Sequence, residues 1–163
     1  MVEINVIGEF NPALENKFTK DISALKKDDI AVLNITSHGG QLEVFKRMAS
    51  KILALKQQGV KIATFVPDYA ESAGFFLFLL GDEREIAEDA TVHYHAPRVK
   101  LGDGFVGTLQ NMSGIMSELQ AYQDFTNSIF KASCDMDPAL FSLLENSELP
   151  MNRTHLQTLG IIN

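Results

Sequence analysis

A strand, a helix and a second strand follow one another between residues 30 and 66, and this order constrains the fold more than any other feature. Residues 30–35 form a short, nearly continuous apolar run, which is typical of a strand covered on both faces in a parallel sheet. Apolar side chains from Leu42 to Leu53 then recur at helical spacing, and residues 60–66 supply the next strand. The order predicts a strand, helix, strand crossover and therefore an α/β fold.

The rest of the chain continues this alternation, without repeats, low-complexity tracts or linkers. Residues 73–80 are too apolar to face water along any side, so we expect a buried helix there, preceded by a loop up to Ser72. The other expected elements are strands at residues 2–7, 85–87 and 91–95, and helices at residues 13–25, 109–132, after Pro138 and at 154–159. We predict one domain over residues 1–163, with a mainly parallel sheet flanked by helices.

Composition excludes several classes of function. Fourteen basic against 21 acidic residues give a net charge of −7, and no cluster of Lys or Arg forms the stripe that a nucleic-acid backbone would need. The single Cys134 excludes an internal disulfide and a zinc site of the CxxC kind. No apolar run is long enough for a membrane-spanning helix, and the first residues have no basic head. We therefore expect a cytoplasmic protein that binds neither nucleic acid nor membranes.

Ser72 is the first candidate for chemistry. It stands where a polar loop gives way to the buried helix, so we expect its hydroxyl at a helix N-terminus, where free amide donors favour a negative oxygen. Ala73 and Gly74 keep the approach to this hydroxyl open. The alternative interpretation is structural, because serine is also a common N-cap residue.

Gly39 and Gly40 follow the strand at residues 30–35, at the edge on which open α/β sheets place their ligands. Ser72 follows the next strand, so both loops are expected to meet at one rim of the sheet. A glycine pair there can aim a backbone N–H at a carbonyl oxygen, although it can also be a tight turn alone.

A serine hydroxyl becomes a good nucleophile when a base takes its proton, and histidine titrates in the right range. His95, at the end of the expected strand, is the best placed of the four histidines. His93 shares its side-chain parity but lies further from the rim, and we interpret it as packed or hydrogen-bonded. His38 either binds substrate or is solvated, and His155 carries no signal.

Three short motifs stand out: Thr-Ser-His-Gly-Gly at residues 36–40, Tyr-Ala-Glu-Ser-Ala-Gly at 69–74 and Tyr-His-Ala-Pro at 94–97. Together they resemble the Clp peptidase family, which shares its fold with signal peptide peptidase A and the crotonases. Their order and spacing match from Val2 to Asn163. The resemblance implies a fold of the Clp and crotonase type, with the helix at residues 109–132 as a projecting handle by which family rings pair face to face.

The resemblance also assigns roles. It implies that Ser72 is the nucleophile, that His95 is the general base, and that the backbone amides of Gly40 and Ala73 form the oxyanion hole. Counting back from residues 160–163, Gly-Ile-Ile-Asn, puts Glu148 at the position of the family's catalytic aspartate. Asn146, no third residue at all, and a solvated role for Glu148 remain open. The implied protein is a serine endopeptidase that acts on peptides or unfolded proteins as a homo-oligomeric ring, without metal or organic cofactor, and stacking of such rings is the preferred interpretation.

The chain departs from the family's pattern at three places. His38 stands where the family has a rigid proline, and Glu71 puts a carboxylate beside the nucleophile. Family members also carry an N-terminal segment that docks to an unfolding ATPase. Because this sequence begins almost at its first strand, we do not expect an ATPase partner.

Three alternatives stay open. Ser72-Ala73-Gly74 is also similar to the motif of signal peptide peptidase A and related membrane-associated peptidases, which use a lysine base, and Lys100 is the nearest candidate. Glu71 and the undetermined third residue are compatible with a catalytically inactive scaffold subunit. A crotonase acting on acyl-CoA is disfavoured, because no basic cluster is present to meet the nucleotide phosphates.

Overall fold

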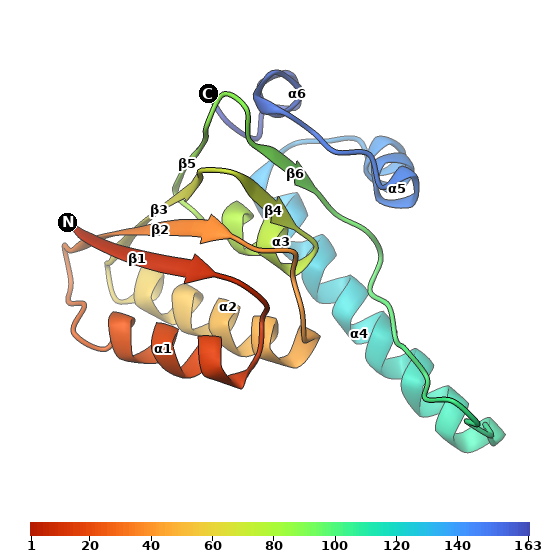
Figure 1. Cartoon of the computed structure of the whole chain (residues 1–163). Coiled ribbons are helices and arrows are strands. Elements are labelled where there is room, and N and C mark those ends of the chain that lie inside the picture. Colours follow the sequence, from red (N-terminus) through yellow and green to blue (C-terminus); the bar gives the residue numbers. More distant parts are fainter.

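Four parallel strands form the main sheet of the computed structural model, which describes residues 1–163 (Figure 1). Their spatial order is β1 (Val2–Ile7), β2 (Ile30–Thr36), β3 (Lys61–Val66) and β5 (Glu83–Ile86). Helices α1 (Pro12–Ile22) and α2 (Leu42–Gln57) lie side by side against one face of this sheet. The predicted α/β class, with a mainly parallel sheet flanked by helices, is confirmed.

A second, two-stranded parallel sheet carries the candidate chemistry. It consists of β4 (Tyr69–Glu71) and β6 (Thr91–His93), and a bridge between Ser37 and Ala70 joins it to the end of β2. The prediction of a loop up to Ser72 is wrong, because three residues are too few for an alternating pattern to be recognised. The strand predicted over residues 91–95 likewise ends at His93.

Helix α3 (Ala73–Leu79) is buried along its whole length, as its sequence predicts. Its Phe75 stacks on Tyr94 with 4.9 Å between ring centroids, and Tyr94 stacks in turn on Phe141 at 5.1 Å. Phe75 and Tyr94 belong to one continuous cluster of 37 buried apolar side chains, and the partly buried Phe141 packs against it. The segment that follows β6 is therefore anchored in the core through Tyr94, between His93 and His95.

Helix α4 (Leu109–Ser133) is the longest element, and its first half projects from the body of the molecule (Figure 1). Its buried side chains begin at Tyr122, whereas Leu109 is 90% and Met116 67% exposed. The N-terminal half of the predicted apolar stripe is thus only partly covered within the protomer, because Ile115 and Leu119 are half-buried while Met116 is exposed. Helices α5 (Pro138–Ser147) and α6 (Arg153–Thr158) complete the chain. No helix is long and apolar enough to cross a membrane.

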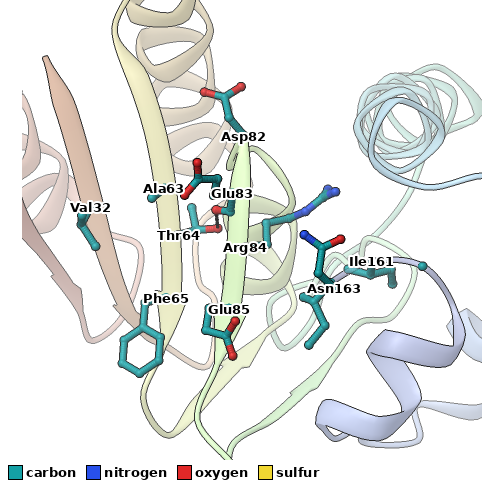
Figure 2. Close-up of a pocket in the computed structure, with 12 residues that line it drawn as sticks. Val32, Ala63, Thr64, Phe65, Asp82, Glu83, Arg84, Glu85, Ile161 and Asn163 are labelled. Carbon is teal, nitrogen blue, oxygen red and sulfur yellow. Dashed lines mark hydrogen bonds between the residues drawn. The ribbon is translucent and has the colours of Figure 1, made fainter. Parts of the chain in front are cut away.

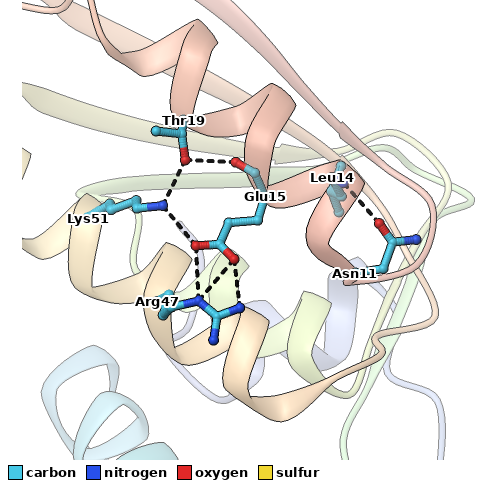
Figure 3. A network of polar contacts seen from close by, with 6 residues as sticks. All are labelled: Asn11, Leu14, Glu15, Thr19, Arg47 and Lys51. Atoms are coloured by element: carbon cyan, nitrogen blue, oxygen red, sulfur yellow. Dashed lines mark hydrogen bonds and ion pairs between the residues drawn. The ribbon is translucent and has the colours of Figure 1, made fainter.

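A network of ion pairs fastens α1 to α2 on the outer side of the molecule (Figure 3). The Glu15 carboxylate accepts hydrogen bonds from Arg47 Nη2 at 2.7 Å and from Lys51 Nζ at 2.9 Å. Lys51 also donates to the Thr19 hydroxyl at 2.7 Å. The hydrogen bonds from Arg47 and Lys51 lower the pKa of Glu15 to about 2.

Candidate active site

Ser72 occupies a sharp turn between β4 and α3. Its φ of 52° and ψ of −120° are rare for a residue with a side chain and carry strain, which the surrounding structure must hold in place. The Ser72 N–H donates to the His93 carbonyl at 2.9 Å, so strand pairing fixes the turn. The Ser72 side chain makes no capping hydrogen bond to the helix. A strained strand-to-helix turn that presents a free hydroxyl is the arrangement that nucleophilic serines adopt on other α/β sheets.

Gly39 lies directly against this serine. Its φ is 94°, and a Cβ atom at Gly39 would sit 2.8 Å from Ser72 Cβ and 3.2 Å from Ser72 Oγ. Only a residue without a side chain fits in such a place. The structure therefore brings the predicted glycine loop and the predicted nucleophile together at one rim.

Two backbone amides near Ser72, those of Gly40 and Ala73, follow carbonyls that are hydrogen-bonded within the protein. The N–H of Phe10 donates to the Gly39 carbonyl at 2.9 Å, and in a trans peptide the Gly40 N–H then points the opposite way. In the same manner the Ser72 carbonyl accepts from the N–H of Phe75 at 3.1 Å, which turns the Ala73 N–H away from the helix. Neither Gly40 nor Ala73 donates to a protein acceptor. Two free donors with fixed directions thus lie on the segments that meet at Ser72.

His95 lies on the same side of its segment as His93, with 6.5 Å between the two ring centroids. Its Nδ1 is 2.8 Å from the Ala96 carbonyl oxygen. Because a carbonyl can only accept, Nδ1 carries the proton in the neutral ring and Nε2 keeps the lone pair that a general base needs. No hydrogen bond joins His95 to Ser72, so the structure does not assemble the predicted pair.

Glu148 lies outside any contact with His95. It is the C-cap of α5 in the left-handed conformation, and its carboxylate pairs with Arg98. The segment that follows Glu148 does lie beside β6, because Met151 and Val92 exchange backbone hydrogen bonds of 2.7 and 2.8 Å. The alternative Asn146 donates to the Ser142 carbonyl instead. The prediction of Glu148 as the third catalytic residue thus gains no contact in its favour, and the Ala96 carbonyl is the group that orients His95.

Glu71 is the site residue that sequence analysis misread. Its Oε2 is 2.7 Å from His38 Nδ1, and its Oε1 is 3.6 Å from His93 Nδ1. The His38 ring also stacks on Tyr69 with 4.1 Å between centroids. Glu71 and His93 are directly paired across β4 and β6, and the sequence alone does not show this strand register. Recognising a three-residue strand at residues 69–71 would have revealed the pair.

Other features of the molecule do not compete for this chemistry. A cavity of about 500 Å³ lies between the β3 and β5 strands and the last residues of the chain, and Figure 2 shows Thr64, Arg84 and Asn163 on its wall. None of the candidate catalytic residues lines it. No group of three or more His, Cys, Asp or Glu side chains is placed to hold a metal ion. Lys100, the alternative base, makes no ion pair or hydrogen bond with the serine turn.

No protein-family model matches the chain, and no curated protein matches its sequence. Inference about function therefore depends on the residues and geometry described above.

Proposed function

We propose that the chain is a serine endopeptidase of the Clp type, with the Clp and crotonase fold, that hydrolyses peptide bonds through an acyl-enzyme at Ser72. The observation that carries the proposal is the strained turn at Ser72, which presents a free hydroxyl against Gly39. The unpaired amides of Gly40 and Ala73 on the two converging segments add the donors that acyl transfer requires.

In the proposed reaction Ser72 Oγ attacks the carbonyl carbon of the scissile peptide bond. His95 Nε2 accepts the hydroxyl proton and returns it to the leaving amine, while the Gly40 and Ala73 amides bind the oxyanion. Water then enters, His95 takes its proton, and the acyl-enzyme is hydrolysed to release the second product and free Ser72. The reaction requires His95 Nε2 to come within hydrogen-bond reach of Ser72 Oγ, because no hydrogen bond joins the two residues in this structure.

We further propose that the active form is a homo-oligomeric ring, stacked through α4. The exposed apolar side chains on the first half of α4, Leu109 and Met116 among them, support this assembly. Contacts between protomers on α4 also border the segment from His95 to residue 108, which leads into that helix. Assembly is then the event that orders this segment and brings His95 to Ser72. The substrates of the proposed peptidase are peptides and unfolded proteins.

An activity-based fluorophosphonate probe tests the nucleophile. We expect it to label the assembled wild-type protein at Ser72, to leave Ser72→Ala unlabelled, and to label His95→Ala at least about 100-fold more slowly, because general-base catalysis contributes about 10²–10⁴-fold. Ser50→Ala, which changes an exposed serine on α2, is the matched control and should label like wild type. Labelling that survives in Ser72→Ala would remove the proposal. Loss of labelling in Lys100→Ala but not in His95→Ala would favour the lysine dyad.

The second candidate is a catalytically inactive scaffold subunit. The lack of a hydrogen bond between Ser72 and His95 and the pairing of Glu148 with Arg98 favour it. Purified protein that forms rings, takes up no probe and cleaves neither casein nor short fluorogenic peptides would establish this function instead.

A further inference from the structure

Glu71 lies at the centre of a polar row that crosses three neighbouring chain segments beside Ser72. One of its carboxylate oxygens is 2.7 Å from His38 Nδ1, and the other is 3.6 Å from His93 Nδ1. Ala70, one residue earlier, pairs with Ser37 on one side and with Val92 on the other. Ser37, Ala70 and Val92 point into the core. The next residue along each segment points to the opposite face, and these residues are His38, Glu71 and His93.

Each member of the row directly adjoins a part of the proposed active site. His38 precedes Gly39 and Gly40, Glu71 precedes Ser72, and His93 is two residues before His95. A carboxylate shared by the two imidazoles therefore links the oxyanion loop, the nucleophile turn and the segment of the base. No other side chain forms an ion pair with each of the two neighbouring segments.

The small sheet needs such a link. Strands β4 and β6 have only three residues each, and single bridges join them to Ser37 and to Met151, so few backbone pairs hold this sheet. Ser72, at the end of β4, is held in a strained conformation, and strain of this kind persists only where the surroundings determine the backbone strongly. Cross-strand side-chain pairs are the usual way in which a sheet is reinforced.

The His38 side chain is also held in place by its neighbours. Its side chain is 70% exposed, yet the ring is fixed twice, by the short contact with Glu71 and by stacking on Tyr69. An exposed side chain ordinarily keeps its rotamer freedom, and fixing it costs entropy. Here the fixed ring stiffens the residue directly before two glycines, which are the most flexible part of the loop.

We propose that Glu71 is a positioning residue that clamps the loop of residues 37–40 and strand β6 to the Ser72 turn through His38 and His93. This inference rests on the proposed peptidase function for its catalytic consequence, but the clamp itself is a structural claim. In this role the Glu71 carboxylate holds His38 in place and so gives the loop the stiffness that a proline at position 38 would give.

Two variants of Glu71 separate the clamp from a simple charge effect. Glu71→Ala removes both contacts, whereas Glu71→Gln keeps an acceptor for one imidazole and offers a donor to the other. We expect Glu71→Ala to slow fluorophosphonate labelling of Ser72 by about 10- to 100-fold, the size of effect that small misplacements of reacting groups produce. Glu71→Gln should recover most of the rate. Glu88→Ala, which removes an exposed and unpaired carboxylate before β6, is the matched control and should label like wild type.

Coupling between the partners gives the decisive kinetic test. If His38 acts through Glu71, the double variant Glu71→Ala/His38→Ala should label no more slowly than Glu71→Ala alone. Rates that multiply would mean that the two residues act independently. That result would overturn the clamp even where each single variant is slow.

Hydrogen exchange tests the clamp without any activity. The Ser72 N–H, bonded to the His93 carbonyl, reports pairing of β4 and β6, and the Glu71 N–H, bonded to the Ser37 carbonyl at 2.8 Å, reports attachment of the loop. Both amides should exchange at least about 10-fold faster in Glu71→Ala than in wild type and Glu71→Gln, with an unchanged melting temperature. Unchanged exchange would overturn the proposal. Faster exchange in a protein whose wild type takes up no probe would support the clamp and contradict the peptidase.

Discussion

Gly39 and Ser72 are in contact so close that no side chain fits between them. A methyl group at Gly39 would lie 2.8 Å from Ser72 Cβ, and the backbone there has a φ of 94°. We predict that Gly39→Ala displaces the loop or the serine and lowers fluorophosphonate labelling of Ser72 at least about 100-fold, the cost expected of a misplacement near 1 Å. The control is Gly102→Ala, since a Cβ at Gly102 meets nothing within 4 Å. Equal labelling rates for the two variants would show that this contact does not matter to the serine.

Removing the hydroxyl group from two buried tyrosines, Tyr94 and Tyr122, should change the free energy of unfolding in opposite directions. The Tyr94 hydroxyl donates to the Phe141 carbonyl at 3.1 Å, whereas the Tyr122 hydroxyl is buried without a partner. Tyr94→Phe should lower the free energy of unfolding by about 1 kcal/mol, because the hydrogen bond to the Phe141 carbonyl is lost. Tyr122→Phe should raise it by about 1 kcal/mol, because an unsatisfied hydroxyl no longer has to be buried. Urea unfolding of both variants beside wild type gives the comparison, and a loss of stability in Tyr122→Phe would mean that its hydroxyl has a partner.

The ion-pair network between α1 and α2 predicts a loss of stability in acid. Arg47 and Lys51 lower the pKa of Glu15 from 4.5 to about 2, so the folded state holds this carboxylate ionised where the unfolded chain protonates it. Its contribution is complete above pH 4.5, decreases as the pH falls, and is lost near pH 2. We expect Glu15→Gln to cost about 1 kcal/mol at pH 7, the upper end for exposed ion pairs, and almost nothing at pH 2. Denaturant titrations at pH 7, 4 and 2 measure the difference, and a constant difference would contradict this account.

Long, strongly patterned segments made most of the fold predictable. Strand β1 begins and ends where its alternating pattern does, and α1 begins at Pro12, one residue before the predicted start, where the Asn11 side chain caps it. Helix α3 is buried because no side of an all-apolar segment can face water. Such signals act over many residues, so a single unusual residue does not obscure them.

The site was less predictable because its elements are short and its contacts are non-local. Ser72 and the glycine loop meet as predicted, but they do so because a bridge between Ser37 and Ala70 joins the end of β2 to β4 of the small sheet. The partnership of Glu71 with His38 depends on a three-residue strand, and that of Glu148 with Arg98 depends on how α5 sits beside a long loop. Neither pairing leaves a periodic trace in the sequence. The contact between Ser72 and the glycine loop could therefore be predicted from the sequence, whereas the partners of Glu71 and Glu148 could not.

The exposed half of α4 leads to a prediction about assembly. Leu109 and Met116 are 90% and 67% exposed, so their apolar side chains contribute little to the stability of an isolated protomer. If this half of α4 pairs with another copy of the chain, Leu109→Glu and Met116→Glu each place a charge in an apolar contact and should shift the protein from its largest assembly to smaller species. The melting temperature of the protomer should stay unchanged.

Sedimentation velocity at matched protein concentrations distinguishes the outcomes. Gln110→Glu is the control, because it adds the same charge at an exposed position of α4 that was polar already. We expect the control to keep the wild-type distribution and both apolar-to-Glu variants to lose the largest species, together with most of their probe labelling at Ser72. Loss of assembly with full labelling would separate α4 from the placement of His95, and an unchanged distribution would show that α4 is not the contact between copies.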